Sequence, residues 1–349
     1  MTRIGVIGAG GGAAAAVYVL DNTLPDAEIT VLEKSRGVCG RAAARRRDGT
    51  VYEYGANYLK SDDERVSRLV TEKFDEGLVE VDGPVWTFDA DGKVSEGRDT
   101  DERKWTYEDG ITRLVKHLFG ATDATVRRNT RVVDVRPDGD GNDEDGRRWW
   151  LTDDDGDEHG PFDAVVVNPP APQTAELLRD TGVDAVERLG KAASDVPYRT
   201  VWTAVLHYPF EIERPYYALI NTDDEHEVGW IGREECKPEH VPDGESLLVV
   251  QAAPDWSAER YDEPPEENVE RLVEHTAEII DDDRLTEPDW TDYQGWKYAL
   301  ADDGVGSGAV RNAADEGIYA VGDWVAGEAR LHAAVRNGLD TGERMAHCL

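Results

Sequence analysis

The fold of this chain is decided by its first stretch, Arg3-Ile4-Gly5-Val6-Ile7-Gly8-Ala9-Gly10-Gly11-Gly12-Ala13. The apolar run at 4–7 is typical of a buried strand, and the glycine turn after it opens an alanine-rich helix that we expect to end near Asp21. A second strand covers 28–32 and is followed by Glu33. Strand, turn, helix and strand in this order form a βαβ unit, which predicts a right-handed crossover and a parallel sheet.

The glycine turn also predicts a nucleotide site. Gly8 and Gly10 let the backbone turn tightly and approach a pyrophosphate, and the helix that begins near Gly11 directs its first N–H groups and its positive dipole end at the phosphates. Ala13 occupies the third position of the pattern, where Gly or Ala is tolerated. Glu33 lies twenty residues after Ala13, where a carboxylate accepts hydrogen bonds from the ribose hydroxyls of an adenosine. This carboxylate argues against a 2′-phosphorylated ribose.

A basic loop follows the second strand and bears on which dinucleotide is bound. The loop runs from Lys34 to Arg41. Arg41 is our candidate for a second pyrophosphate contact, because its planar guanidinium suits phosphate oxygens. The turn Tyr54-Gly55-Ala56-Asn57-Tyr58 comes next. These residues alone leave NAD and FAD open.

The composition excludes several classes of protein. The chain has 349 residues, with 38 Lys and Arg against 74 Asp and Glu, and so a net charge of −36 at pH 7. A chain this negative repels phosphate backbones and has no basic stripe, so we expect no nucleic-acid partner. No apolar run approaches the roughly 20 residues of a membrane span. The 10 Trp and 13 Tyr argue against disorder.

The acid excess predicts a salty environment. Self-repulsion destabilises a compact acidic fold in dilute buffer, and concentrated salt, with a Debye length of about 3 Å at 1 M, relieves it. We therefore expect a halophilic protein in a high-salt cytoplasm, with an acidic protein of an ordinary cell as the alternative. We expect no metal, because the three cysteines are widely spaced and the acidic tracts at 138–145 and 153–157 lack the pattern of a calcium loop.

Taken in order, these motifs resemble the FAD-binding amine-oxidoreductase superfamily, and within it the renalases and renalase-like proteins. The superfamily pattern is an N-terminal fingerprint, then Glu-Lys, Gly-Gly-Arg and Gly-Ala-x-Tyr. Here Glu33-Lys34, Gly40-Arg41 and 55–58 match, while Cys39 stands in place of the first Gly of the triplet. Near the C-terminus, Val321-Gly322-Asp323-Trp324 matches the segment whose Asp reaches the ribityl and phosphate region of FAD.

Two further segments carry the resemblance to renalase, and a third resembles a helix that contacts the flavin. The segments 109–117 and Trp296-Lys297-Tyr298 are similar to renalase signatures. The residues 327–334 look like the start of the helix that points at the flavin pyrimidine ring, where helix N–H groups stabilise the negative charge of reduced flavin. His332 lies where it adds positive charge or faces solvent. Trp296 and Tyr298 line the pocket if the resemblance holds, and otherwise pack a sheet face.

The resemblance implies FAD as cofactor and a defined set of contacts. Because the flavin carries the redox chemistry, we assign no catalytic residue. The pocket candidates are Tyr58, Trp296, Tyr298 and His332. The expected cofactor-binding residues are Gly8, Gly10, Gly11, Gly12, Ala13, Glu33, Lys34, Arg41, Gly55, Ala56, Asn57, Tyr58, Val133, Gly322, Asp323 and Leu331.

We expect an α/β fold with two domains. A Rossmann-like FAD-binding domain with a parallel sheet is built from 1–60, 108–170 and 290–349. A second, α+β substrate domain is built from 61–107 and 171–289 on an antiparallel sheet. Alternating apolar positions predict its strands at 198–208, 216–220, 228–231 and 246–252, ahead of a helix near 266–280.

The function that the resemblance implies is oxidation of a reduced small molecule, with hydride transfer to flavin N5 and then to dioxygen or another acceptor. Renalase-like activity implies isomeric dihydronicotinamide nucleotides as substrates, and Arg199, Arg214 or Arg233 are candidates for binding their phosphates. The alternatives are an amine oxidase or a carotenoid-type desaturase of the same superfamily, and a flavin-binding redox-sensing module without turnover. The oligomeric state stays open.

Overall fold

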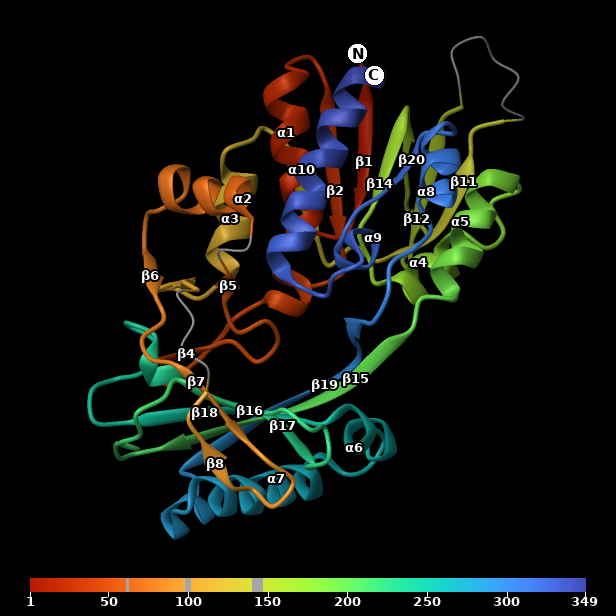
Figure 1. Cartoon of the computed structure of the whole chain (residues 1–349). Helices are drawn as coiled ribbons and strands as arrows, with labels where there is room; N and C mark the ends of the chain where they lie inside the picture. Colours follow the sequence, from red (N-terminus) through yellow and green to blue (C-terminus); the bar gives the residue numbers. More distant parts are fainter. Residues whose placement is uncertain (61–62, 98–101, 140–146) are drawn as a thin grey trace. The chain divides into compact units, whose positions relative to one another are not determined.

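The computed structural model describes residues 1–60, 63–97, 102–139 and 147–349 (Figure 1). The acidic turn expected at 138–145 therefore lies, from 140 onward, outside the described residues. The chain divides into two compact units, each built from separate segments. Unit 1 contains Met1–Arg41, Leu114–Pro197 and Ala301–Leu349, and unit 2 contains Ala42–Arg113 and Tyr198–Leu300.

The units differ in their bounds from the domains expected from the sequence. The strands β3 (Arg45–Arg47) and β4 (Thr50–Tyr52) belong to unit 2 by contact, and the helices α4 (Ala171–Leu177) and α5 (Asp184–Ser194) belong to unit 1. The sequence analysis placed these segments the other way round. The assignment of a cofactor role to one unit and a substrate role to the other stays a prediction.

Unit 1 contains the predicted parallel sheet. Its five strands lie in the order β10-β2-β1-β14-β20, and every neighbouring pair is parallel. Helix α1 (Gly11–Thr23) connects β1 to β2, which confirms the βαβ unit. The sequence analysis missed β10, because Thr-Val-Arg-Arg has one apolar residue and no strand pattern. The strands are β1 (Arg3–Ile7), β2 (Glu28–Glu33), β10 (Thr125–Arg128), β14 (Ala164–Val167) and β20 (Ile318–Ala320).

Helices α1 and α10 (Leu331–Cys348) lie side by side in unit 1 (Figure 1). Gly338 and Gly342 are four residues apart, so they share one face of α10. A Cβ on Gly338 would come 2.1 Å from the Gly12 carbonyl oxygen, and one on Gly342 would come 2.9 Å from that of Ala16. The small residues of both helices thus permit a close approach, which anchors α10 against the helix that follows the glycine turn.

Unit 2 is built around a seven-stranded sheet in the order β19-β15-β18-β17-β16-β7-β8. The pairs β15–β18, β18–β17, β17–β16 and β7–β8 are antiparallel, as expected from the sequence, and the sheet is mixed because β7 pairs parallel with β16. Strand β19 was not predicted beyond its residues 296–298. The strands are β7 (Val85–Phe88), β8 (Val94–Ser95), β15 (Tyr198–Tyr208), β16 (Ala218–Asn221), β17 (Val228–Arg233), β18 (Ser246–Ala252) and β19 (Trp290–Ala301).

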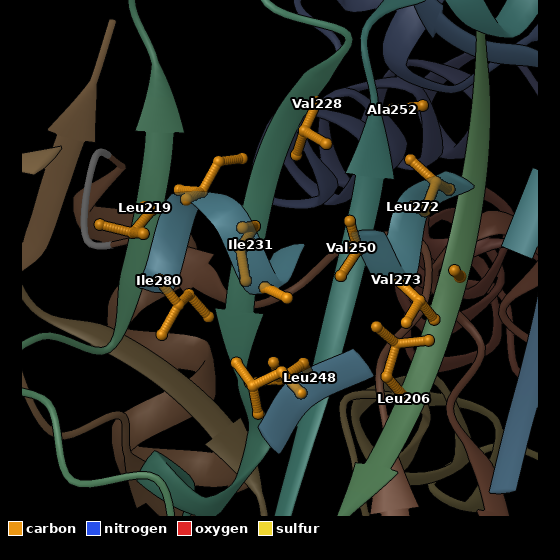
Figure 2. Close-up of a cluster of buried hydrophobic side chains, with 14 of the residues drawn as sticks. Leu206, Leu219, Val228, Ile231, Leu248, Val250, Ala252, Leu272, Val273 and Ile280 are labelled. Carbon is orange, nitrogen blue, oxygen red and sulfur yellow. The ribbon is translucent and has the colours of Figure 1, made fainter. Parts of the chain in front are cut away.

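The core of unit 2 lies between one face of this sheet and α7 (Pro265–Ile280). Figure 2 shows Leu272, Val273 and Ile280 of α7 over the apolar side chains of the strands. The sheet side of this core includes Leu206, Leu219, Val228, Ile231, Leu248 and Val250, all buried. Because successive side chains of a strand alternate between faces, this core fixes which residues of β16 and β17 lie on the opposite face.

The remaining elements are short or lie around the two sheets. Among the described helices, none is long and apolar enough to cross a membrane. These elements are β5 (Leu59–Lys60), β6 (Leu78–Glu80), β9 (Lys104–Tyr107), β11 (Val132–Pro137), β12 (Trp149–Asp153), β13 (Glu158–Phe162), α2 (Glu64–Arg68), the π-helical turn Leu69–Lys73, α3 (Thr112–Gly120), α6 (Pro254–Glu259), α8 (Ser307–Ala314), α9 (Asp323–Ala326), and the 3₁₀ turns Gly40–Ala42, Glu234–Cys236 and Asp283–Thr286.

Candidate cofactor site

The order of the strands in the parallel sheet of unit 1 reverses between β1 and β14. From β1 the chain continues to β2 on one side, and β14 and β20 lie on the other side. Ligands of open parallel sheets bind at such a switch point, beyond the carboxyl ends of the strands. Gly8 follows β1 and Asn168 follows β14, so both lie at this edge.

The glycine turn has the geometry that its residues were predicted to allow. Gly8 has a φ of +88°, which L side chains rarely adopt, and its N–H donates to the Leu32 carbonyl at 2.8 Å. A Cβ on Gly10 would come 2.4 Å from Asn168 Oδ1. Gly10 is the N-cap of α1 and provides no side-chain cap. The first N–H groups of α1 are therefore left for an anion, such as the phosphates of a dinucleotide.

Glu33 connects the glycine turn with the loop after β2. Its carboxylate is buried and accepts from the Ala9 N–H and the Ser35 N–H, each at 2.7 Å. Each carboxylate oxygen keeps a further acceptor position, because it has two lone pairs. Glu33 thus holds the turn in place and retains the capacity to accept from ribose hydroxyls. Lys34 donates to Gln173 Oε1 at 3.3 Å.

Asn168 is a site residue that the sequence analysis missed. Its Oδ1 accepts from the Gly10 N–H at 3.0 Å, and its Nδ2 donates to the Val321 carbonyl at 3.1 Å. One side chain therefore connects the glycine turn with the segment after β20. A polar residue directly after the apolar run 164–167 was the signal that pointed to it.

Arg41 and Asp323, both expected to contact the cofactor, pair with each other. Two guanidinium nitrogens donate to the two carboxylate oxygens at 2.7 and 2.8 Å. This fork-to-fork pair fixes the plane of the guanidinium. Gly322, with a φ of +130°, donates its N–H to Asn337 Oδ1 at 2.9 Å.

Cys39 adopts the backbone conformation that the family pattern assigns to glycine. Its φ is +86°, and its N–H donates to the Ala9 carbonyl at 2.8 Å. The departure from the Gly-Gly-Arg triplet therefore places a β-carbon in the left-handed region, which is strained for L residues. The next residue, Gly40, also has positive φ, at +56°.

The N-terminus of α10 lies against the start of α1. A Cβ on Gly11 would come 2.6 Å from Leu331 Cδ1, and one on Gly12 would come 3.1 Å from the Ala334 carbonyl oxygen. Arg330 is the N-cap of α10 and its side chain makes no capping bond. His332 is 2% exposed, and its Nε2 lies 3.3 Å from Glu328 Oε1, so it is not a solvent-facing residue. Val133, on β11, is 47% exposed.

The other predicted residues lie in unit 2. The Gly55 carbonyl accepts from Gln251 Nε2 at 2.9 Å, and Asn57 Oδ1 is buried with no hydrogen-bond partner among the described residues. Trp296 stacks on Tyr54, with ring centroids 5.4 Å apart, and donates from Nε1 to the Tyr54 carbonyl at 3.3 Å. Tyr298 packs edge-on against Tyr198 at 5.8 Å.

Two of the basic candidates for substrate phosphates are occupied by the chain itself. The Arg233 guanidinium donates to the Arg214, Tyr216 and Ile212 carbonyls and pairs with Glu235. Arg214 donates to the Glu213 and Ile280 carbonyls. Both side chains therefore stabilise the sheet and its loops.

Ala56 and Tyr58 lie in the same turn as Gly55, and Tyr58 packs against Tyr217 and Trp230.

A buried charged cluster of unit 2 lies at the base of that turn. Lys237 Nζ donates to Glu53 at 2.7 Å and to Glu234 at 2.6 Å, and all three side chains are 0% exposed. His240 Nδ1 lies 3.1 Å from Glu234 Oε2, and its Nε2 lies 2.9 Å from the Tyr107 carbonyl. The ring is therefore held between the Glu234 carboxylate and a backbone carbonyl.

The cluster also contains three potential metal ligands. Ligand atoms of Glu53, Glu234 and His240 lie within 4.8 Å of one another. Lys237 supplies the positive charge that a metal would bring, because its ammonium contacts both carboxylates. Burial raises the pKa of Glu234, but Lys237 and His240 outweigh it and lower that pKa below its usual value. The cluster therefore fixes the residues that precede the turn 55–58.

The residues of unit 1 fit a dinucleotide with an unphosphorylated adenosine ribose. The uncapped start of α1, the side-chain-free turn at Gly8 and Gly10 and the guanidinium of Arg41 suit the pyrophosphate, and the Glu33 carboxylate suits the ribose. Residues 6–72 match the NAD(P)-binding Rossmann-like domain. Residues 80–346 match the model described as flavin containing amine oxidoreductase.

The chain belongs to the flavin-containing amine oxidoreductase family. It is an FAD-dependent oxidoreductase, and the match spans most of both units. The expected superfamily is thus confirmed.

Two solved structures share the fold of this chain. A protein of Exiguobacterium sp. 255-15 that is provisionally assigned as a protoporphyrinogen oxidase is 15% identical, with a TM-score of 0.79, over 100% of this chain and 99% of that one. A wild-type putrescine oxidase bound to putrescine is 12% identical, with a TM-score of 0.73, over 99% of each chain. At these identities the likeness establishes the α/β architecture and leaves the substrate to other arguments.

Proposed function

We propose that this FAD-dependent enzyme oxidises a reduced small molecule of the dihydronicotinamide class. The observation that carries the redox part is the site of unit 1, where Glu33, Arg41 and the start of α1 meet the needs of FAD at one sheet edge. The substrate class is supported by the similarity of 109–117 and 296–298 to renalase signatures.

When bound, FAD would supply two-electron chemistry as the hydride acceptor for the substrate, with dioxygen or another acceptor to reoxidise it. The chain's own residues would bind the cofactor, orient it and stabilise its negative charge. The first N–H groups of α1 and the guanidinium of Arg41 would hold the pyrophosphate, and Asp323 keeps the guanidinium plane fixed. The uncapped N-terminus of α10 supplies a positive dipole end for developing negative charge.

Amine oxidation is the second candidate. The rings of Tyr58, Tyr217 and Trp230 lie 6.0 to 6.2 Å apart by their centroids, and aromatic faces attract cations such as protonated amines. Both candidates use the same cofactor and differ in which donor reduces it.

The experiment that tests the proposal is anaerobic mixing of the flavin-loaded protein, purified in concentrated salt, with dihydronicotinamide isomers and with amines. Flavin reduction is followed as loss of absorbance near about 450 nm, because the cofactor carries the redox chemistry. We expect rapid bleaching by a dihydronicotinamide isomer and none by putrescine. Bleaching by amines alone would contradict the dihydronicotinamide proposal and support amine oxidation. No bleaching by any donor would favour a flavin-binding module without turnover.

The net charge of −36 further leads us to propose that the enzyme works in the high-salt cytoplasm of a halophile. Like charges repel across the folded surface, and concentrated salt screens this repulsion. The dependence of stability on salt tests this proposal.

A further inference from the structure

One face of the seven-stranded sheet carries an aromatic cluster. Ile231 of β17 points into the core beneath α7 (Figure 2), so its neighbours Trp230 and Gly232 point to the opposite face. There Trp230 lies beside Tyr217, which precedes β16, and beside Tyr58. The three ring centroids are 6.0 to 6.2 Å apart. Tyr58, a pocket candidate, therefore belongs to a cluster contributed by three segments of unit 2.

The cluster contains two buried donors without an acceptor. Tyr217 Oη and Trp230 Nε1 both lack a hydrogen-bond partner among the described residues, and the Tyr217 residue is 0% exposed. Both atoms border one point, since a Cβ on Gly232 would lie 2.9 Å from Trp230 Nε1 and 3.8 Å from Tyr217 Oη. Buried polar groups in folded proteins are nearly always hydrogen-bonded. The two atoms thus provide donors that the described chain does not satisfy.

The chemistry of the two groups defines what they accept. An indole N–H only donates. Burial raises the pKa of the Tyr217 hydroxyl well above its ordinary value, in spite of Lys237 nearby, so this group keeps its proton and donates. The ammonium of Lys237 lies 5.8 Å from the Tyr217 ring, but it is held by the carboxylates of Glu53 and Glu234. The pair therefore offers two uncharged donors, which suit an uncharged oxygen.

We propose that Tyr217 Oη and Trp230 Nε1 bind a carbonyl oxygen of the substrate, of the carboxamide type, beside Tyr58. The inference rests on the proposed function and names the group by which the substrate is recognised. A protonated diamine offers N–H donors and no acceptor, so it leaves both groups unsatisfied. A dihydronicotinamide meets the two donors through its carboxamide oxygen and packs its ring against the cluster.

The test is a binding measurement on the FAD-loaded protein, so it does not depend on turnover. Nicotinamide and 3-methylpyridine are titrated calorimetrically, because they share the ring and differ in the carboxamide. The variants are Tyr217→Phe and Trp230→Phe, which remove a donor each and keep an aromatic ring. The matched control is Tyr208→Phe, since Tyr208 is equally buried and its hydroxyl already donates to the Leu285 carbonyl at 2.8 Å.

We expect each site variant to weaken nicotinamide about five- to tenfold, as for loss of one hydrogen bond, and to leave 3-methylpyridine unchanged. Tyr208→Phe should leave both ligands unchanged but lower the melting temperature, while Tyr217→Phe should not lower it. Equal nicotinamide affinities in wild type and both site variants, or no binding of nicotinamide to the wild type, would overturn the inference. If no donor reduces the flavin while the site variants still lose nicotinamide, the proposed function fails and this binding site stands.

Discussion

Replacement of Lys237 by Met tests the buried charged cluster of unit 2. The substitution keeps most of the side-chain volume and removes the ammonium that contacts Glu53 and Glu234 at 2.7 and 2.6 Å, in a place with no solvent exposure. Removal of one partner of a buried ion pair costs about 3 to 5 kcal/mol, because the other charge stays buried without compensation. His240 still faces Glu234, so we expect a value near the lower end.

The assay is thermal unfolding followed by circular dichroism. For a unit of this size each kcal/mol lowers the melting temperature by about 2 to 4 °C, so a cost of about 3 kcal/mol should lower it by about 6 to 12 °C. Lys116→Met, at an exposed position of α3, is the matched control and should change the melting temperature by no more than about 2 °C.

The pH dependence adds a second readout. In wild type the pKa of Glu234 is lowered, so its contribution to stability is present above the ordinary carboxyl pKa and is lost as the pH falls. In the variant the loss of Lys237 leaves burial to raise the pKa of Glu234, so the stability from this residue is lost as the pH rises. The difference between the two proteins should therefore be larger at pH 8 than at about pH 5. A difference below about 1 kcal/mol, or one independent of pH, would refute the assigned role of the cluster.

Three further predictions follow from unit 1 and from the charge. Arg41→Ala should weaken FAD binding about tenfold, because a guanidinium is lost from the pyrophosphate site. The measurement is the flavin-to-protein ratio after dialysis, and an unchanged ratio would remove Arg41 from the site. Cys39→Gly should unfold at higher denaturant than Cys39→Ala by about 1 kcal/mol, since φ is +86° and both variants lose the thiol; equal midpoints would contradict the strain. The melting temperature of the wild type should rise steadily between about 0.1 and 2 M KCl, and a flat or falling curve would argue against adaptation to salt.

The sequence predicted the parts of the site that are local along the chain. The segment 3–33 contains its own strand, turn, helix and acidic residue, so the glycine turn and Glu33 could be placed from spacing alone. Cys39 was recognised as a departure from the pattern, and its φ of +86° explains why glycine is usual there.

Other features depend on segments far apart in the sequence. Asn168 reaches Gly10 only because β14 pairs with β1, and Glu53 meets Lys237 across 184 residues. The parallel pairing of β7 with β16 depends likewise on tertiary packing. So does the length of β19, whose sequence has no periodic pattern that favours one face. The pairing and the length of these strands are therefore set by residues that are distant in the sequence.

The most direct test of the account is the absorbance spectrum of the purified chain, followed by chromatography of the cofactor released on denaturation. The account predicts a flavin spectrum with close to one FAD for each chain, and loss of most of this FAD in a variant that fills the turn, Gly10→Leu, because its side chain would collide with Asn168. A colourless wild-type protein that does not take up added FAD, or a Gly10→Leu variant with full FAD content, would contradict it.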